Sequence, residues 1–165
     1  MYLFNGDFIN RGSFGFEVIL ALFAYKLLYP KSFYLTRGNH EHITLAKHYG
    51  FENEVNTKYS KTMFEYFAET FETLPLANLI NKKILVVHGG LSNSDITLDD
   101  IKNIYRFKSY VQANSLMEYL LWSGMNYDIL INKIYLFLIN SEFVIFFKIQ
   151  KKNLDVILVR EEELE

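Results

Sequence analysis

Cysteine is absent from this sequence of 165 residues, and proline occurs only twice. Without cysteine the chain can form neither a disulfide nor a thiolate metal site, so any metal ion would need carboxylate, amide or imidazole ligands. The absence of cysteine also fits a reducing compartment, and we therefore expect an intracellular protein, cytoplasmic or nuclear.

A surplus of basic residues is missing as well, because 17 Lys and Arg residues stand against 19 Asp and Glu residues, for a net charge of −2. Without a positive field, the sequence gives no electrostatic support for binding nucleic acid. Disorder is not expected either, since 50% of the residues are hydrophobic and 17% are aromatic. The length suits one domain of ordinary size with a core of its own.

No signal peptide is visible at the start of the sequence, which has no basic segment followed by an apolar core. The apolar run over residues 129–149 (ILINKIYLFLINSEFVIFFKI) is long enough to cross a bilayer, but Asn132, Lys133 and the segment Asn140-Ser141-Glu142 interrupt it. We expect two buried segments with a polar turn at residues 140–142 rather than a membrane span.

The first part of the sequence has the pattern of a strand, a helix and a second strand. The apolar residues Tyr2–Phe4 stop at Asn5 and predict a strand. Apolar side chains at helical spacing predict a helix over Phe14–Leu28, capped by Ser13, and Ser32–Leu35 predicts the next strand. In such a βαβ unit both strands end at the same edge of a sheet, where open α/β sheets bind ligands.

The remaining predicted elements are two helices and three strands: helices over Asn53–Phe71 and Thr97–Ile104, and strands over Ala77–Ile80, Lys83–Val87 and Leu154–Val159. The turn sequence NKK between the first two of these strands indicates a hairpin. No internal repeat and no linker divides the chain, so we expect a single domain.

Potential metal ligands follow three of the predicted strands. Asp7 comes after the first strand, Asn39 lies in the loop after the second, and His88 directly follows the run ILVV. Hard divalent ions and borderline transition metals accept carboxylate, amide oxygen and imidazole ligands together. Arg11 could then hold phosphoryl oxygens with its planar guanidinium group.

Each of these residues also has an ordinary structural interpretation. Asp7 and Asn39 could be turn residues, and His88 could be a hydrogen-bonded histidine at a strand end. Other polar side chains of these loops could be surface groups, solvated or in weak ion pairs: His40, His42, Arg11 and Arg37. Only the joint pattern, with three loops after three strands, favours a functional site.

Three motifs of this sequence, GDFINRG (6–12), RGNHE (37–41) and HGGL (88–91), resemble in order and spacing the GDxVDRG, GNHE and HGG motifs of the phosphoprotein phosphatases, the metal-dependent serine/threonine phosphatases. The similarity covers roughly Leu3–Ile104 and is greatest to the type-five members, whose tetratricopeptide repeats this sequence lacks. LLWS (120–123) extends it, whereas residues 105–165 are otherwise weakly similar or divergent. We expect a single partial phosphatase catalytic domain over residues 1–165.

The resemblance implies a fold of the α/β (α+β) class, a metallophosphoesterase-like β-sandwich flanked by helices, here incomplete. It also implies two metal ions (manganese, iron or zinc) and hydrolysis of phosphoserine and phosphothreonine in a phosphoprotein substrate. By position it makes three residues metal ligands: Asp7, Asn39 and His88. It makes Arg11 a phosphate clamp and His40 the acid that protonates the leaving oxygen, which suits the tunable pKa of histidine.

The sequence departs from the family's pattern at several places. Asn10 stands where the family has the aspartate that orients the catalytic histidine, and an amide can present its NH2 group instead of an acceptor oxygen. The family's GDxHG motif, which supplies two further metal ligands, is not found before Asp7. The segment LLWSGMN lacks the family's aspartate, and a weak match over Asn153–Glu162 would put Glu161 at a histidine position.

From these departures we expect one bound metal ion or none, and hydrolysis that is impaired or absent. One alternative is a pseudophosphatase that recognises phosphoproteins through Arg11. Another is a fragment that folds poorly, because a missing strand would uncover apolar surface and a sheet edge.

Overall fold

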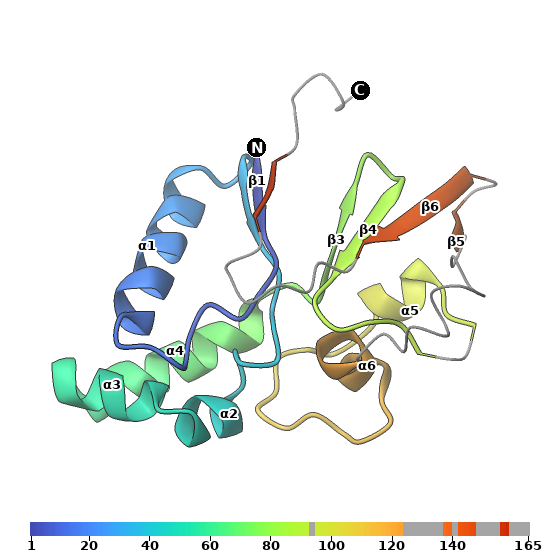
Figure 1. Cartoon of the computed structure of the whole chain (residues 1–165). Helices are drawn as coiled ribbons and strands as arrows, with labels where there is room; N and C mark the ends of the chain where they lie inside the picture. The colour runs from blue at the N-terminus through green and yellow to red at the C-terminus, as the bar shows by residue number, and fades with distance from the viewer. Residues whose placement is uncertain (93–94, 124–136, 140–141, 148–155, 159–165) are drawn as a thin grey trace.

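The computed structural model describes residues 1–92, 95–123, 137–139, 142–147 and 156–158. Its strands form two sheets, with helices beside and below them (Figure 1). The first sheet has the order β2-β1-β7 and consists of β1 (Tyr2–Phe4), β2 (Phe33–Leu35) and β7 (Val156–Leu158). β1 runs parallel to β2 and antiparallel to β7, which lies within the predicted strand Leu154–Val159.

Helix α1 (Gly15–Leu28) connects the parallel strands β1 and β2, so the predicted βαβ unit is confirmed. The predicted cap is wrong, because α1 begins after Phe14 and no side chain caps it. Instead the Phe16 N–H donates to Glu54 Oε1 at 3.0 Å. A carboxylate from a neighbouring helix thus takes the place of the Ser13 hydroxyl at this helix end.

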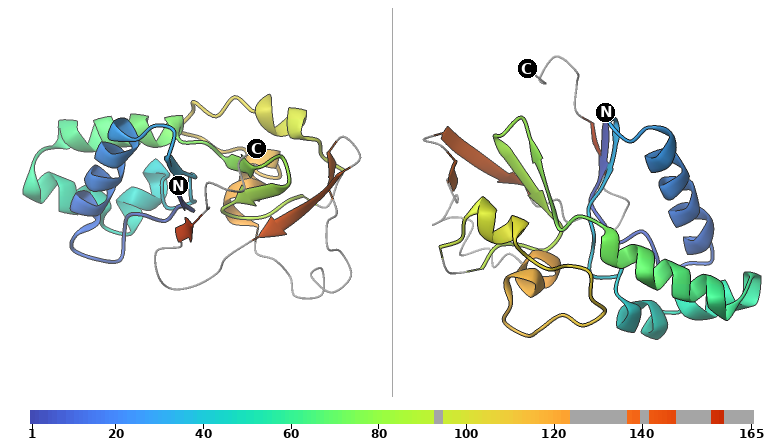
Figure 2. Two further views of the ribbon diagram at one scale, coloured as in Figure 1. Left: turned by 90° about the horizontal axis from the view of Figure 1, so that it is seen from above. Right: turned by 180° about the vertical axis from the view of Figure 1, so that it is seen from behind.

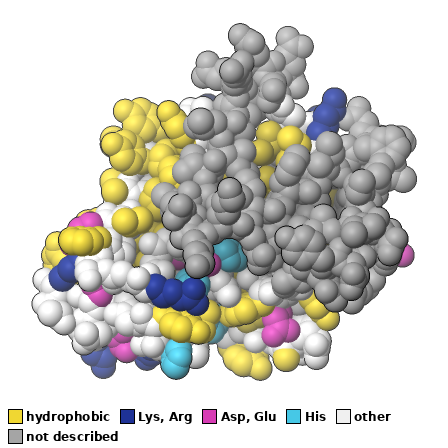
Figure 3. Space-filling model, viewed as in Figure 1, with side chains coloured by type: hydrophobic (Ala, Val, Ile, Leu, Met, Phe, Trp, Pro, Cys, Tyr) yellow, Lys and Arg dark blue, Asp and Glu magenta, His cyan; other side chains and the backbone are white. Residues whose placement is uncertain are grey.

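The outer face of α1 is apolar, like its inner face. Its only charged residues are Glu17 and Lys26, and Leu27 and Leu28 at its end are 83 and 68% exposed. Figure 3 shows hydrophobic side chains gathered over this part of the molecule. A helix without a polar face is usually covered on all sides, so this surface of α1 is unusual for a solvated helix.

Three helices follow β2: α2 (Ile43–His48), α3 (Phe51–Lys58) and α4 (Lys61–Thr73). The prediction of one helix over Asn53–Phe71 is wrong, because the backbone leaves the helical conformation at Tyr59 (φ −139°, ψ −91°) and a new helix begins after Ser60. The Ser60 hydroxyl accepts a hydrogen bond from the Met63 N–H at 3.2 Å. Ser60, in the middle of the predicted helix, therefore caps the start of α4.

A cluster of phenylalanines joins α1, α3 and α4: Phe16, Phe51, Phe64, Phe67 and Phe71, all at most 4% exposed. The ring of Phe51 lies 5.4 Å from that of Phe67 and 5.9 Å from that of Phe71, between centroids. This core holds the helices against the first sheet, and with them the loops that follow β1 and β2 (Figure 2).

The second sheet has the order β3-β4-β6-β5. Its strands are β3 (Ala77–Ile80), β4 (Ile84–Val87), β5 (Phe137–Ile139) and β6 (Glu142–Phe147). β3 and β4 form the predicted hairpin, whose turn residues Asn81 and Lys82 both have positive φ, as a tight turn between twisted strands requires.

The apolar run over residues 129–149 contributes the antiparallel strands β5 and β6. Glu142, the last residue of the predicted turn, begins β6. The other two turn residues, 140–141, lie outside the described part of the chain, as do 129–136 and 148–149. Among the described residues, no helix has the length and apolar character needed to span a bilayer.

Two short helices lie below the second sheet: α5 (Leu98–Lys102) and α6 (Leu116–Trp122). α5 confirms the predicted helix, and Thr97 and Asp100 form a capping box at its start. α6 packs its apolar residues against Leu85 and Val87 of β4. The Gly89 N–H donates to the Leu120 carbonyl at 2.6 Å, so the segment after β4 is tied to α6.

Candidate active site

The loops after β1, β2 and β4 meet where the two sheets approach each other. Asn5 Nδ2 donates to the Val87 carbonyl at 3.1 Å, and His88 Nδ1 lies 2.6 Å from the Asn5 carbonyl. A Cβ atom on Gly6 would lie 2.5 Å from Gly38 N and 2.7 Å from His88 Nδ1. Three segments that are distant in sequence are therefore in direct contact, as the three motifs predicted.

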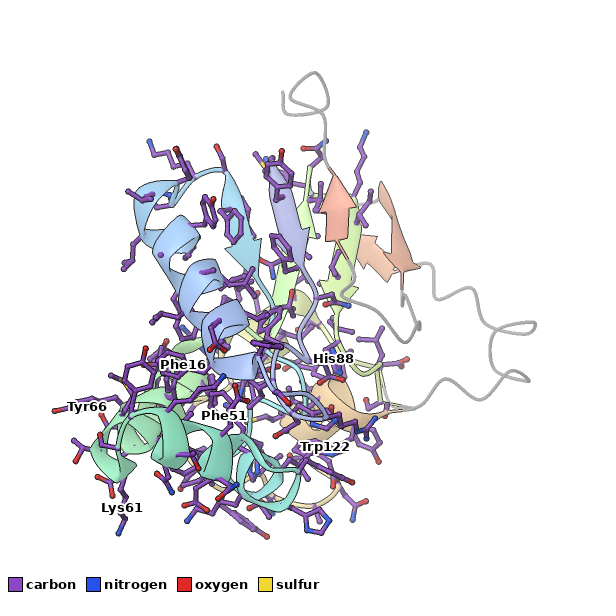
Figure 4. All side chains as sticks on the ribbon, turned by 60° about the vertical axis from the view of Figure 1, so that its left-hand side comes forward. Phe16, Phe51, Lys61, Tyr66, His88 and Trp122 are labelled. Atoms are coloured by element: carbon purple, nitrogen blue, oxygen red, sulfur yellow. The ribbon has the colours of Figure 1, made fainter. Side chains whose placement is uncertain are left out.

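Asp7 lies at the centre of this contact, in a left-handed conformation with φ of 58°. Its Oδ1 atom lies 3.3 Å from His88 Nε2 and accepts a hydrogen bond from the His40 N–H at 3.2 Å. Figure 4 shows His88 below the ends of the strands. Asp7 thus contacts both other loops, and the interpretation of Asp7 as a plain turn residue leaves these contacts unexplained.

Asp7 and His88 shift each other's pKa in opposite directions. Burial alone would raise the pKa of Asp7, but the hydrogen bond and positive charge of His88 outweigh it and the pKa is lowered. Burial would lower the pKa of His88, but Asp7 outweighs it and the pKa is raised. His88 Nδ1 donates to the Asn5 carbonyl, and this hydrogen bond orients the ring so that Nε2 faces the Asp7 carboxylate.

Asn39 lies on the β2 loop and is half-buried. Both of its neighbours contact Asp7, since His40 donates to it and a Cβ on Gly38 would lie 2.6 Å from Asp7 Oδ1. The described residues include no group of three or more His, Cys, Asp or Glu side chains placed to hold a metal. The predicted ligand set has only two such side chains, and the role of the Asn39 amide as the third ligand stays a prediction.

Glu41, the last residue of RGNHE, has a role that the sequence did not reveal. Its Oε2 atom accepts hydrogen bonds from the Asp7 and Gly38 N–H groups at 2.8 and 2.9 Å, and Oε1 accepts from the Phe8 N–H at 2.7 Å. Glu41 is fully buried, and burial together with the charge of Asp7 raises its pKa to about 7. This one carboxyl group joins the β1 loop to the β2 loop.

Replacing Glu41 by alanine is expected to lower the free energy of unfolding by at least about 2 kcal/mol. Three backbone N–H groups would lose their acceptor, and an unsatisfied buried donor costs about 1–3 kcal/mol. Chemical denaturation followed by circular dichroism measures this loss. Glu69→Ala, on the exposed face of α4, is the matched control, and equal losses in the two variants would contradict the role of Glu41.

Arg37, His40 and His42 are not surface groups, so that interpretation of them is wrong. Arg37 is 1% exposed, and its Nε atom donates to the Glu41 carbonyl at 2.9 Å. Burial lowers the pKa of Arg37, against the raising effect of nearby carboxylates. His42 is buried beside the ring of Trp122, and its Nδ1 accepts from the Thr44 N–H at the start of α2. Both residues hold the β2 loop in place.

Arg11 and Asn10 follow Asp7 in the β1 loop, and both have positive φ. Arg11 is exposed, with its Cζ atom 5.1 Å from the centre of the Tyr49 ring, and it forms no ion pair with the described residues. Asn10 Nδ2 lies 2.7 Å from His40 Nδ1. The structure therefore brings Asn10 and His40 together as predicted, while the phosphate-clamp role of Arg11 stays a prediction.

His40 is buried, and burial lowers its pKa, as do the positive charges of Arg11 and His88. The negative charge of Asp7 acts in the opposite direction. Without a bound anion, His40 is thus biased toward the neutral imidazole. The predicted role of His40 as an acid therefore depends on whether Asn10 donates a hydrogen bond to His40 Nδ1 or accepts one from it.

The sequence of this chain is similar to a known family and to several known proteins. The family model for calcineurin-like phosphoesterases matches residues 1–159. Human serine/threonine-protein phosphatase 5 is 54% identical over 123 residues, which are 74% of this chain and 24% of the relative. Serine/threonine-protein phosphatase T of Trypanosoma brucei brucei is 51% identical over 123 residues, 74% of this chain and 26% of the relative. This chain therefore spans about a quarter of the length of these relatives.

A solved structure shows the same similarity in three dimensions. A protein serine/threonine phosphatase from Saccharomyces cerevisiae, described as similar to human phosphatase PP5, superposes with a TM-score of 0.71 at 50% sequence identity. The superposition covers 73% of this chain and 38% of the yeast chain. The predicted fold class, an α/β metallophosphoesterase-like fold, is confirmed.

Proposed function

Because the chain belongs to the calcineurin-like phosphoesterase family, we propose that it hydrolyses phosphate esters of serine and threonine in proteins, as the names of its relatives indicate. The resemblance predicted from the three motifs, to serine/threonine phosphatases of type five, is thereby confirmed. The observation that supports the proposal best is the 3.3 Å separation of Asp7 Oδ1 and His88 Nε2, which come from loops of two different sheets.

Asp7 and His88 fit a divalent metal ion. Ligand atoms at 2.0–2.2 Å from one ion lie about 3 Å apart, close to the separation of the two atoms here. Together with Asn39 they would hold one manganese, iron or zinc ion, which would polarise a phosphoryl oxygen and activate water when bound. The family uses divalent metals, and for this chain we expect one ion at most.

The other residues of the site would bind and orient the phosphoryl group. Arg11 is exposed in the β1 loop, and its planar guanidinium matches two phosphoryl oxygens. The His40 backbone N–H fixes Asp7, and Glu41 holds the loops that carry both residues. We expect hydrolysis to be slow, because Asn10 replaces the acid that would stabilise a charged His40.

The proposal is tested by hydrolysis of p-nitrophenyl phosphate after removal of all metal with a chelator. Turnover should be negligible in the metal-free protein and return, slowly, on addition of manganese. Hydrolysis that is indifferent to metal would contradict the proposal. The lack of cysteine also leads us to propose a cytoplasmic or nuclear location, which cell fractionation would test.

The contact between Asn10 and His40 also favours a second candidate, a pseudophosphatase that binds phosphoproteins without hydrolysing them. In that case Arg11→Ala should weaken binding of a phosphoserine peptide at least about tenfold, since a charge-assisted hydrogen bond contributes about 1.5–3 kcal/mol. Arg106→Ala is the matched control, because Arg106 also lies over an aromatic ring, 4.5 Å from Phe107. Fluorescence anisotropy measures both, and equal affinity of Arg11→Ala and the parent chain would exclude this role.

A further inference from the structure

The amide of Asn10 is held in one orientation by two backbone groups. Its Oδ1 atom accepts a hydrogen bond from the Phe51 N–H at 3.3 Å, and its Nδ2 atom donates to the Leu45 carbonyl at 3.4 Å. The remaining hydrogen of Nδ2 is directed at His40 Nδ1, 2.7 Å away. We propose that Asn10 is a positioning residue that holds His40 as the tautomer with its single proton on Nε2.

Turning the amide over would cost both backbone contacts. The NH2 group would then face the Phe51 N–H, so two donors would meet, and Oδ1 would face the Leu45 carbonyl, so two acceptors would meet. Phe51 is fully buried at the first turn of α3, where its N–H has no acceptor in its own helix. An unsatisfied buried N–H is unfavourable, so the observed orientation is the stable one.

The orientation of Asn10 decides the role of each His40 nitrogen. An NH2 group can only donate, so Nδ1 must accept and carries no proton. The one proton of neutral His40 is therefore on Nε2, which has no hydrogen-bond partner among the described residues. His40 offers a hydrogen-bond donor to whatever binds beside Asp7 and Arg11.

The tautomer limits what His40 can do in the proposed hydrolysis, and this part of the inference rests on the proposed function. When water attacks a phosphate ester, the water oxygen bonds to phosphorus and its proton passes to the solvent. The bond to the leaving oxygen breaks with its electron pair on that oxygen. His40 can hydrogen-bond this oxygen, but giving up its only proton would leave an imidazolate. A serine alkoxide must then take its proton from water, whereas a phenolate leaves without one. The chain should favour aryl over alkyl phosphate esters.

Nitrogen NMR tests the tautomer directly in the whole chain. Long-range ¹H–¹⁵N spectra distinguish a protonated ring nitrogen from an unprotonated one, and the signals of His40, one of four histidines, are identified by their loss in His40→Gln. We expect an unprotonated Nδ1 in the parent chain and a protonated Nδ1 in Asn10→Asp. Asn78→Asp is the matched control. The Asn78 NH2 group donates to Thr36 Oγ1 at 2.8 Å and forms no hydrogen bond with His40, so this change should leave the His40 tautomer as it is. A protonated Nδ1 in the parent chain would overturn the proposal.

Kinetics tests the inferred preference for aryl over alkyl phosphate esters. The rate on a phosphoserine peptide divided by that on p-nitrophenyl phosphate should rise at least about tenfold in Asn10→Asp, since a positioned general acid contributes about 10²–10⁴-fold. An unchanged ratio would overturn the inferred preference for aryl esters. If neither chain hydrolyses either substrate, the proposed function fails, and the nitrogen spectra alone decide the tautomer.

Discussion

Replacing Asp7 by alanine is expected to reduce manganese-dependent hydrolysis of p-nitrophenyl phosphate at least about 100-fold. The Asp7 carboxylate contacts both other loops of the site, and even residues that only support a metal ligand cost 10–100-fold when lost. The same variant should bind manganese more weakly, because His88 would lose the carboxylate that faces its Nε2 atom.

Two variants make this result specific. Asp99→Ala removes an exposed aspartate that pairs with Lys102 on α5, far along the sequence from the site, and should leave the rate unchanged. Asp7→Asn keeps an acceptor for the His40 N–H but removes the charge, so its rate should also be low. Activity in Asp7→Ala close to that of the parent chain would remove Asp7 from the site.

Replacing Gly6 by alanine is expected to lower the free energy of unfolding by about 3 kcal/mol and to weaken metal binding at least about tenfold. Gly6 has φ of 82°, and its Cβ would lie 2.5 Å from Gly38 N and 2.7 Å from His88 Nδ1. Positive φ costs a non-glycine residue about 1–3 kcal/mol, and overpacking costs about as much again. Relief of the clash would move the three loops apart, and with them the ligands.

Two other glycines separate the contributions to this loss. Gly12 belongs to the same loop, has open space around its Cα atom and no positive φ, so Gly12→Ala should be close to neutral. Gly50 has φ of 100° but also open space around it, so Gly50→Ala should lose only the stability that a positive φ costs a non-glycine residue. Differential scanning fluorimetry compares the stabilities of the variants, and manganese titration measures their affinity for the metal. A Gly6→Ala variant no less stable than Gly50→Ala would show that the loops are not in close contact.

The local sequence was sufficient to predict which three loops meet at one place in the fold. The runs before Asp7 and His88 are short, apolar and rich in aromatic or β-branched residues, so each marks a strand, and the polar residue after each run marks the strand end. The hairpin at Asn81-Lys82 and the capping box at Thr97 were predictable for the same reason, because a few adjacent residues determine them.

The interactions that hold the loops together were not predictable in this way. Charged residues are usually at the surface, and Glu41 is buried with its carboxylate bonded to N–H groups of the β1 loop, which are distant in sequence. Arg37 is buried with its Nε atom bonded to the Glu41 carbonyl and with Glu72 of α4 near enough that its charge opposes the lowering of the Arg37 pKa by burial. The end of α3 at Tyr59 was missed as well, because the apolar spacing continues through it. Such long-range contacts exist only in the folded chain.

Manganese-induced line broadening in the ¹H–¹⁵N spectrum tests most directly whether three loops share one cation. At low manganese concentration, the side-chain NH2 signal of Asn39 and the backbone signals of Asp7 and His88 should broaden first and together. The side-chain signal of Asn78, which is bonded to Thr36 next to the β2 loop, should broaden only at higher manganese concentration. Broadening that spares Asn39, or that begins elsewhere in the chain, would contradict a shared metal site at the ends of β1, β2 and β4.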